Sequence, residues 1–513
     1  MMFIIDGRVN SGQNMSMTDR RLAVRMLTLN TVAFTVCFAV WTMYGVLGAF
    51  LAEHQVIPLT KVQLGWLLGV PILTGSIMRL PVGILTDRFG GKPVYIGVML
   101  LAAAGAASAS LAQTFEHLVY SGLLFGMSGA AFAVGIAYTS VFWPKEKQGT
   151  ALGIFGVGNA GSAVTTLLSP IALDRLTNKG ANMDGWRQLP LIYAAALIVM
   201  TVAFALLTKN KVVQSSTPKT LKTMLLPLKS VRVWRFGAYY FLVFGAFVAL
   251  AQWLVPYYLS VYGMTLAMAG LMASIFSLPS GLIRALGGWM SDKFGARATM
   301  YWVLASCTVL FALVIAPRMD IMSPGQGVLA DRAGTVTAVS DSQIQVGDQF
   351  YPLASPSPES KQTTLSDRGS SMNEGTFILP KSSSWQEPVV QVGQSVKKRE
   401  LLARGVTHVY FQANVWVFTV IVFLAGIMMG IGKAAVYKHI PEYFPEDIGV
   451  VGGIVGVIGG LGGFVCPILF GYLLKSTGLW TSCWLFLAFI SALCLVWMHL
   501  TILRMTKQSP ATE

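Results

Sequence analysis

The sequence predicts an all-α multi-pass membrane protein, with twelve transmembrane helices in two six-helix halves and a small extracytoplasmic β-rich insert between helices nine and ten. Three observations predict this fold class: an apolar composition, twelve long apolar runs and an internal repeat. Of 513 residues, 54% are apolar and 12% are charged, and the mean hydropathy is +0.62. A soluble globular protein carries roughly a quarter charged residues. The composition therefore excludes a soluble enzyme, a disordered chain and a collagen-like rod.

The apolar runs follow a polar, basic segment at residues 1–28. We expect this segment to be a cytoplasmic tail, because it lacks the apolar core and cleavage site of a signal peptide. Each later run is long enough to cross about 30 Å of hydrocarbon, and none alternates as barrel strands do. The twelve expected spans are 29–51, 64–85, 93–112, 117–142, 149–172, 187–208, 233–260, 266–289, 299–316, 412–437, 449–474 and 479–502.

The basic residues between these runs predict the orientation. The net charge is +15, and the connection at 209–232 is rich in lysine and contains no acidic residue. On a membrane protein such charge marks cytoplasmic loops rather than nucleic-acid binding. We expect both termini to be cytoplasmic and the protein to lie in the cytoplasmic (inner) membrane. The expected domains are a six-helix half at 29–208, a linker at 209–232, helices seven to nine at 233–317, the insert at 318–408, helices ten to twelve at 409–502 and a tail at 503–513.

An internal repeat supports two related halves. The stretch 79–92 recurs at 284–297 with a constant offset of 205, which pairs Arg79 with Arg284, Gly83 with Gly288, Asp87 with Asp292, Gly90 with Gly295, and Lys92 with Arg297. A second match pairs Phe142-Trp-Pro with Tyr443-Phe-Pro at an offset of 301. The offset grows by 96 residues between the two matches, so the second half contains an insert. The polar stretch 318–408 has β-type alternation around a Ser/Pro-rich segment at 355–371, which is typical of a small β module or a partly disordered loop.

Two deep arginines are the first candidate site. Arg79 and Arg284 each lie eight residues before the Asp of the loop motif, which places them about 12 Å inside the membrane. Insertion of one central Arg costs roughly 2.5–3.5 kcal/mol. None of the twelve expected spans contains Asp or Glu. The two cations therefore require a substrate anion, cavity water or backbone carbonyls as partners; the alternative is that both side chains extend toward the loop.

Helices five and ten add further candidates. Lys433 is a third deep cation, which either changes its charge in apolar surroundings or extends toward the headgroups. Helix five is rich in glycine, which permits close helix packing, but packing does not explain Asn159 in its middle. The amide of Asn159 can donate to an anion.

The duplicated loop motif is a candidate gate. It offers carboxylates near helix termini and ion pairs that can break, which suits a latch between two conformations; the alternative is a solvated turn. Its residues are Gly83, Asp87, Arg88 and Gly90 in the first half and Gly288, Asp292 and Gly295 in the second.

No catalytic constellation is evident. The five histidines do not pair with a nucleophile, the five cysteines lack metal-ligand spacing, and no phosphate-binding loop is present. We therefore expect no enzymatic activity, no cofactor and no metal site.

Three stretches resemble a known family. The duplicated Gly-x-Leu-x-Asp-Arg-x-Gly-Gly-Lys loop resembles the signature of the major facilitator superfamily. The stretches from Phe142 to Gly161 and from Gly432 to Pro441 resemble the signatures of its nitrate/nitrite porter (NarK-type) family. The resemblance implies that Arg79 and Arg284 hold nitrate or nitrite. It also implies roles near the anion for Asn159, Gly430 and Lys433 and, as aromatic walls, for Phe132, Tyr240 and Phe244.

The resemblance implies a nitrate transporter, with nitrite as a further substrate, that works by alternating access. The form of the helix-five motif is more similar to the proton symporters of the family than to its nitrate/nitrite exchangers, and we carry both alternatives. A third alternative is a membrane sensor or scaffold on a transporter-like body, with the insert as the recognition module. The sequence does not indicate a partner for the insert.

Overall fold

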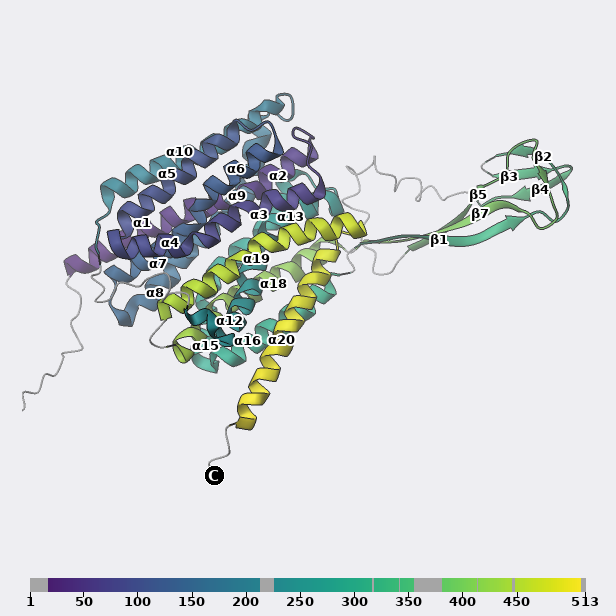
Figure 1. Cartoon of the computed structure of the whole chain (residues 1–513). Helices are drawn as coiled ribbons and strands as arrows, with labels where there is room; N and C mark the ends of the chain where they lie inside the picture. The colour runs from purple at the N-terminus through teal and green to yellow at the C-terminus, as the bar shows by residue number, and fades with distance from the viewer. Residues whose placement is uncertain are drawn as a thin grey trace, which may run out of the picture.

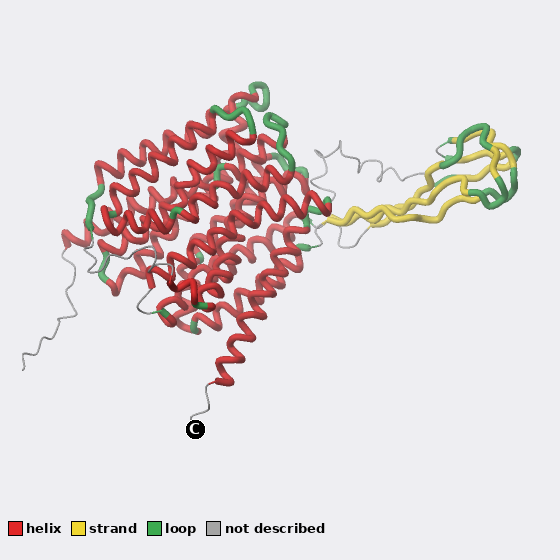
Figure 2. Tube along the Cα trace, in the orientation of Figure 1, coloured by secondary structure: helices red, strands yellow, loops and turns green. Residues whose placement is uncertain are grey.

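The structure, a computed structural model, describes residues 17–212, 226–315, 318–340, 342–354, 381–412, 414–444 and 448–508. It consists of a helical bundle and a β-rich arm that projects from one end of the bundle (Figure 1, Figure 2). The start of α1 and the end of α20 lie toward the opposite end. We call these two ends of the bundle the insert end and the terminal end.

Eleven helices of the described segments are long and apolar enough to cross a membrane, and a pair bent by 48° makes a twelfth span. This confirms the predicted fold class. The first six spans are α1 (Met17–Trp41) with α2 (Tyr44–Glu53); α3 (Lys61–Ile77) with α4 (Arg79–Phe89); α5 (Gly91–Ser110); α6 (Phe115–Phe125), η1 (Gly126–Ala130) and α7 (Ala131–Phe142); α8 (Lys145–Gly156), η2 (Val157–Ala160) and α9 (Gly161–Leu176); and η3 (Met183–Arg187) with α10 (Gln188–Leu207).

The second half repeats this arrangement after a short 3-10 turn, η4 (Leu226–Lys229). Its spans are α12 (Val231–Tyr240), η5 (Phe241–Ala246) and α13 (Phe247–Tyr262); α14 (Leu266–Leu282) with α15 (Arg284–Phe294); α16 (Ala296–Leu313); α18 (Val415–Tyr443); α19 (Ile448–Thr477); and α20 (Ser482–Gln508). The helix α1 begins at Met17, within the stretch 1–28 that is expected to be a cytoplasmic tail. The Arg, Leu, Ala and Met residues between Met17 and Thr28 are good helix formers, which extend the helix beyond the apolar run.

The repeat is visible in the helix boundaries. The bounds of α3 and α4 recur in α14 and α15 at an offset of 205 residues. Thr60 and Thr265 cap the two copies by accepting a hydrogen bond from a backbone N–H three residues later. Gly90 and Gly295 end them with φ of +85° and +87°, a conformation that glycine adopts at little cost. Both breaks fall directly before the deep arginines, at Met78 and Ile283.

The two halves are in close contact toward the insert end. There α3 packs along α19 and α14 along α9, whereas α4 and α8 meet the other half at few points. A Cβ added at Gly69 would lie 2.7 Å from the carbonyl oxygen of Phe464, so the helix backbones approach each other directly. The halves are therefore closed toward the insert end and looser toward the terminal end.

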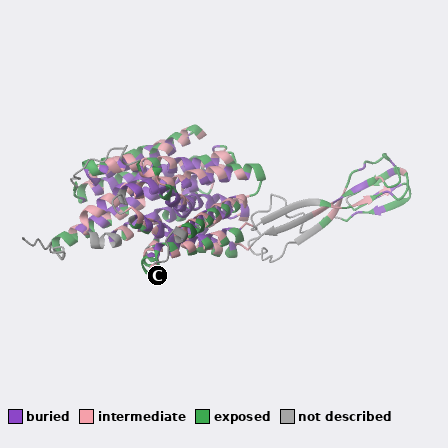
Figure 3. Ribbon diagram, turned by 60° about the horizontal axis from the view of Figure 1, so that its bottom comes forward, coloured by how far each residue is buried: buried purple, intermediate pink, exposed green. Residues whose placement is uncertain are grey.

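The insert forms two small antiparallel sheets. Strands β1 (Arg318–Leu329), β7 (Leu401–Gln412) and β5 (Lys381–Pro388) form one sheet, in that order. Strands β4 (Gln349–Pro352), β3 (Gln343–Val346), β2 (Gly334–Val339) and β6 (Ser395–Val396) form the other. A separate apolar cluster at the tip includes Val336, Ile344 and Val396, distinct from the core of the bundle (Figure 3). The structure thus favours the β module; the Ser/Pro-rich segment 355–371 lies outside the described residues.

Candidate anion-binding site

Irregular turns of the helices meet at the middle of the bundle. Arg79 and Arg284 each follow a helix break, Phe132 follows the 3-10 turn η1, Asn159 lies in the 3-10 turn η2, and Phe244 lies in the π-helical turn η5. Such departures from α-helical geometry are frequent at functional sites because they re-aim side chains and free backbone groups.

Arg79 is held on one side and unpaired on the other. It is 5% exposed, and its Nη1 donates to the carbonyl oxygen of Gly456, on α19 of the other half, at 2.8 Å. Its guanidinium carbon lies 5.1 Å from the ring centroid of Phe244 and 5.2 Å from that of Phe132. Within the described residues, its buried Nε and Nη2 have no hydrogen-bond partner. Buried donors without a partner are costly, so this edge of the guanidinium is suited to an acceptor from outside the chain.

Arg284 approaches the same aromatic ring. Its guanidinium carbon lies 5.8 Å from the centroid of Phe132 and 5.9 Å from that of Tyr437. Its Nη1 is also buried, and the described part of the chain gives it no partner. The structure therefore brings both predicted arginines, one from each half, to the interface between the two halves, around Phe132.

Aromatic residues wall the site. Tyr240 stacks on Phe244 with ring centroids 4.9 Å apart and planes within 6°, and Tyr437 packs edge-on against Tyr240 at 5.1 Å. The hydroxyl of Tyr437 donates to the carbonyl of Gly452 at 3.2 Å. Tyr437 was not predicted from the sequence, and neither was Trp41, whose ring lies 5.7 Å from the Arg79 guanidinium carbon. Tyr437 follows Lys433 by four residues and thus shares its helix face, which was an available signal.

Asn159 is buried, and its amide is partly used by its own helix. Its Nδ2 donates to the carbonyl of Gly156 at 2.7 Å, which leaves one amide hydrogen for another acceptor. A Cβ added at Gly156 would lie 3.6 Å from Arg284 Nη1, so this turn borders the guanidinium. The absence of a side chain at Gly156 leaves room there.

Lys433 and Gly430 both lie on α18, but Lys433 contacts the cage with its side chain whereas Gly430 lies in a helix contact. Lys433 is 1% exposed; its Nζ donates to Ser280 Oγ at 3.0 Å and lies 3.1 Å from the ring centroid of Phe247. A Cβ added at Gly430 would lie 2.8 Å from the carbonyl oxygen of Ser280. Gly430 therefore permits close packing of α18 on α14, and the structure places it in this helix contact.

The site contains cations and no carboxylate partner. The ion pairs of the described residues include Arg187–Asp184, Arg404–Glu387 and Lys438–Asp292, and none of these three involves Arg79, Arg284 or Lys433. The same part of the chain holds no cluster of residues that suits a metal ion. Two arginines and a lysine therefore share a buried aromatic cage to which the described residues contribute no acid, and such an arrangement of cations is suited to a small anion.

The loop motif lies at the terminal end, away from this cage. Asp292 pairs with Lys438 and so joins α15 to α18 within the second half. In the first half, Asn210 bridges the turn at Gly90 by donating to the carbonyl of Phe89 at 2.9 Å. The guanidinium carbon of Arg88 lies 5.3 Å from the ring of Phe89. The remaining glycines, Gly83 and Gly288, have no atom within 4 Å of an added Cβ.

Comparisons with known proteins agree with this geometry. The sequence model of the Major Facilitator Superfamily matches residues 29–330 and 401–513. The chain is 37% identical to the probable nitrate/nitrite antiporter NarK1 of Thermus thermophilus over 494 residues, which cover 96% of this chain and 94% of the relative. It is 27% identical to the probable nitrate transporter NarT of Staphylococcus carnosus, over 93% and 95% of the two chains. A bacterial homologue of the human lysosomal transporter Spinster, solved in an inward-facing, occupied conformation, shares the fold with a TM-score of 0.60 at 13% identity, over 96% of this chain and 99% of that one.

Proposed function

Because the chain belongs to the nitrate/nitrite porter (NarK-type) family of the major facilitator superfamily, a family of transporters and not of enzymes, we propose that it carries nitrate and nitrite across the membrane by alternating access. The observation that supports this most directly is the pair of guanidinium groups with buried, unpaired N–H donors in a cage without carboxylates. The anion binds between Arg79 and Arg284.

The shape of the site favours a small planar oxyanion. A guanidinium group is planar and presents paired N–H donors, which match two oxygens of a nitrate ion as well as its charge. The rings of Phe132, Phe244 and Tyr240 limit the thickness of the ligand. A tetrahedral, more highly charged phosphate fits this slot poorly.

Occupancy of the site is coupled to movement of the halves. Arg79 comes from the first half and Arg284 from the second, so closure around an empty site brings two cations together. A bound anion reduces this repulsion and favours the closed state. The hydrogen bond from Arg79 to Gly456 also crosses between the halves, so rocking of one half against the other must break or move it.

Proton symport is the first coupling that we propose. Without an acidic residue in the cage, Lys433 is the group available to bind and release a proton. Among the described residues, the ammonium of Lys433 donates a hydrogen bond to Ser280 and lies over the rings of Phe244 and Phe247. An ammonium held by a hydroxyl and two rings is weakly compensated, which favours a change of charge during transport.

Exchange of nitrate for nitrite is the second coupling. Its specific support is the name of the 37% identical relative, a probable nitrate/nitrite antiporter. A cationic cage that closes only when loaded also favours exchange, because the empty carrier cannot return.

Nitrate uptake into vesicles separates the two couplings, with the pH gradient and the internal nitrite varied independently. Symport predicts uptake that an inward proton gradient drives in the absence of internal nitrite. Exchange predicts uptake that requires internal nitrite and ignores the pH gradient. If neither condition gives nitrate flux, the proposed function is wrong.

We also propose that the terminal end faces the cytoplasm, since the loop motifs and the described ends of the basic linker, 209–212 and 226–232, lie there. Labelling of single cysteines introduced near residues 210 and 340 with a membrane-impermeant reagent tests this. Residue 340 in the arm should react from outside intact cells, and residue 210 only after the membrane is opened.

A further inference from the structure

One buried cation lies outside the anion cage. Among the described residues, the buried cationic side chains are Arg79, Arg235 and Lys433, and the first and third belong to the cage. Arg235 lies on α12 at the terminal end and is 7% exposed. In the part of the chain that the structure describes, its guanidinium forms no ion pair or hydrogen bond. A largely buried arginine without a carboxylate partner is suited to an anion from outside the chain.

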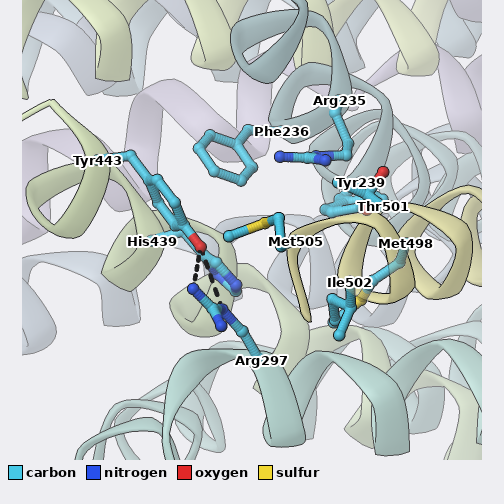
Figure 4. Close-up of a pocket in the computed structure, with 10 residues that line it drawn as sticks. All are labelled: Arg235, Phe236, Tyr239, Arg297, His439, Tyr443, Met498, Thr501, Ile502 and Met505. Atoms are coloured by element: carbon cyan, nitrogen blue, oxygen red, sulfur yellow. Dashed lines mark hydrogen bonds between the residues drawn. The ribbon is translucent and has the colours of Figure 1, made fainter. Parts of the chain in front are cut away.

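The neighbours of Arg235 form a small cavity with a basic wall (Figure 4). The cavity encloses about 20 Å³, or about 290 Å³ with its open mouth. Arg297 lies on its wall and donates from Nε to the hydroxyl of Tyr443 at 3.0 Å. Arg232 lies 5.3 Å from the ring of Tyr443. Two arginines, Arg235 and Arg297, thus line one cavity, Arg232 packs on the ring of Tyr443 at its edge, and no carboxylate is among the described residues that line it.

The corresponding corner of the first half has no such cluster. By the internal repeat, Lys92 matches Arg297 and Phe142 matches Tyr443. Lys92 donates from Nζ to the carbonyl of Thr208 at 2.8 Å, and the hydroxyl of Tyr138 donates to the carbonyl of Lys209 at 2.8 Å. The described residues of that corner include no buried cation. The fold of a half therefore does not need a buried arginine at this place, and the arginine cluster of the second half requires another explanation.

The cavity is bordered by the outer helices of the second half. Four of its lining residues, Met498, Thr501, Ile502 and Met505, come from α20. Helices α16 and α20 are the most exposed unbent spans of the second half. Their outer faces carry apolar side chains such as Val309 and Phe489, which are 58% and 65% exposed. The exposed Trp234, next to Arg235, is typical of the membrane–water interface.

We propose that this corner binds the phosphate of an anionic phospholipid headgroup. Arg235 and Arg297 donate to the phosphate oxygens, and the acyl chains lie along α16 and α20. Basic pockets between transmembrane helices at the interface are suited to such headgroups, because charge and geometry favour the phosphate while the neighbouring apolar surface holds the chains. The site is separate from the anion cage and does not depend on what the cage transports.

Native mass spectrometry of the full-length protein with added phosphatidylglycerol tests this proposal. Arg235→Gln and Arg297→Gln should each weaken phosphatidylglycerol binding about fivefold, as loss of one interfacial charge predicts. Lys92→Gln, the repeat-related change in the first half, should leave binding unchanged. Arg297 is exposed, so its variant is expected to fold even if Arg235→Gln does not. Equal phosphatidylglycerol binding by wild type and Arg297→Gln would overturn the proposal.

A second experiment identifies the source of the phosphate. Inorganic phosphate should not raise the melting temperature of the wild-type protein. Phosphatidylcholine, whose phosphate is balanced by its own choline, should bind the wild type more weakly than phosphatidylglycerol, and both arginine variants should reduce this difference. If inorganic phosphate stabilises the wild type, and the two arginine variants abolish that effect, the ligand is a soluble anion and the lipid assignment is wrong.

Discussion

Arg79 is anchored through Nη1 and open through Nε and Nη2, so its fork is oriented before an anion arrives. Pre-orientation of this kind reduces the entropy lost on binding and favours two-point contact with a planar oxyanion. Arg79→Lys retains the charge and loses the fork. We expect the rate of nitrate uptake to fall by about tenfold or more, because the variant loses one charge-assisted hydrogen bond to the anion. As a control, Arg175→Lys, at an exposed position on α9, should take up nitrate at the wild-type rate. Near-normal uptake by Arg79→Lys would count against bidentate binding of the anion.

Lys433 provides the residue-scale test of proton coupling. Lys433→Met keeps an unbranched chain beside Phe247 and removes the charge. Under symport, we expect the variant to fold and bind nitrate but to lose the pH dependence of uptake. Ser280→Ala removes the hydrogen-bond acceptor of Nζ and keeps the charge, so its uptake should remain pH-dependent. An unchanged pH profile in Lys433→Met removes this residue from the proton path.

At the scale of elements, the contact of α3 with α19 closes the insert end. A Cβ at Gly69 would lie 2.7 Å from a backbone oxygen that cannot move away alone. Gly69→Ala should therefore lower the free energy of unfolding by about 1–3 kcal/mol, measured by thermal unfolding in one detergent. At Gly97, on α5, an added Cβ meets no atom within 4 Å, so Gly97→Ala should be neutral or stabilising. Equal destabilisation by both changes would show that the contact at Gly69 is not close.

The arm offers a pH test at the same scale. The guanidinium of Arg404 on β7 hydrogen-bonds the carboxylate of Glu387 on β5 at 3.0 Å and lowers the pKa of that carboxyl. A lowered folded-state pKa stabilises the sheet above the unfolded-state pKa, and this contribution is lost as pH falls through the folded-state pKa. Hydrogen exchange of β5 and β7, corrected for intrinsic rates, should show protection that falls with acidification in the wild type. In Glu387→Gln, protection should be lower at neutral pH and less sensitive to acid; identical profiles would contradict the role of this pair.

The sequence predicted some elements of the site better than others. The duplicated loop motif and the lack of acidic residues located Arg79 and Arg284, because the cost of a charge inside a membrane depends on depth, which the sequence shows. The sequence did not predict that Trp41 and Tyr437 line the cage, because the wall of the cage depends on which faces of distant helices meet. The start of α1 was missed since the hydropathy pattern marks the membrane boundary and not the helix end. Helix packing explains the placement of Gly430, which the family resemblance assigned to the substrate.

At the scale of the whole molecule, the arm leaves and rejoins the bundle at one place. Its first and last strand residues, Arg318 and Gln412, are paired across β1 and β7, where antiparallel partners lie about 5 Å apart. A short Gly/Ser turn in place of residues 319–411 should therefore keep α16 and α18 in position. We expect this variant to take up nitrate at a rate close to wild type. Loss of uptake with retained folding would favour the alternative in which the arm is needed for function.

The central claim is that one small anion is shared by an arginine from each half. Isothermal titration of the purified protein with nitrate tests it most directly, with Arg79→Gln and Arg284→Gln measured beside the wild type. We predict one nitrate per chain for the wild type and no measurable binding for either variant. Wild-type affinity in either single variant would contradict the shared site.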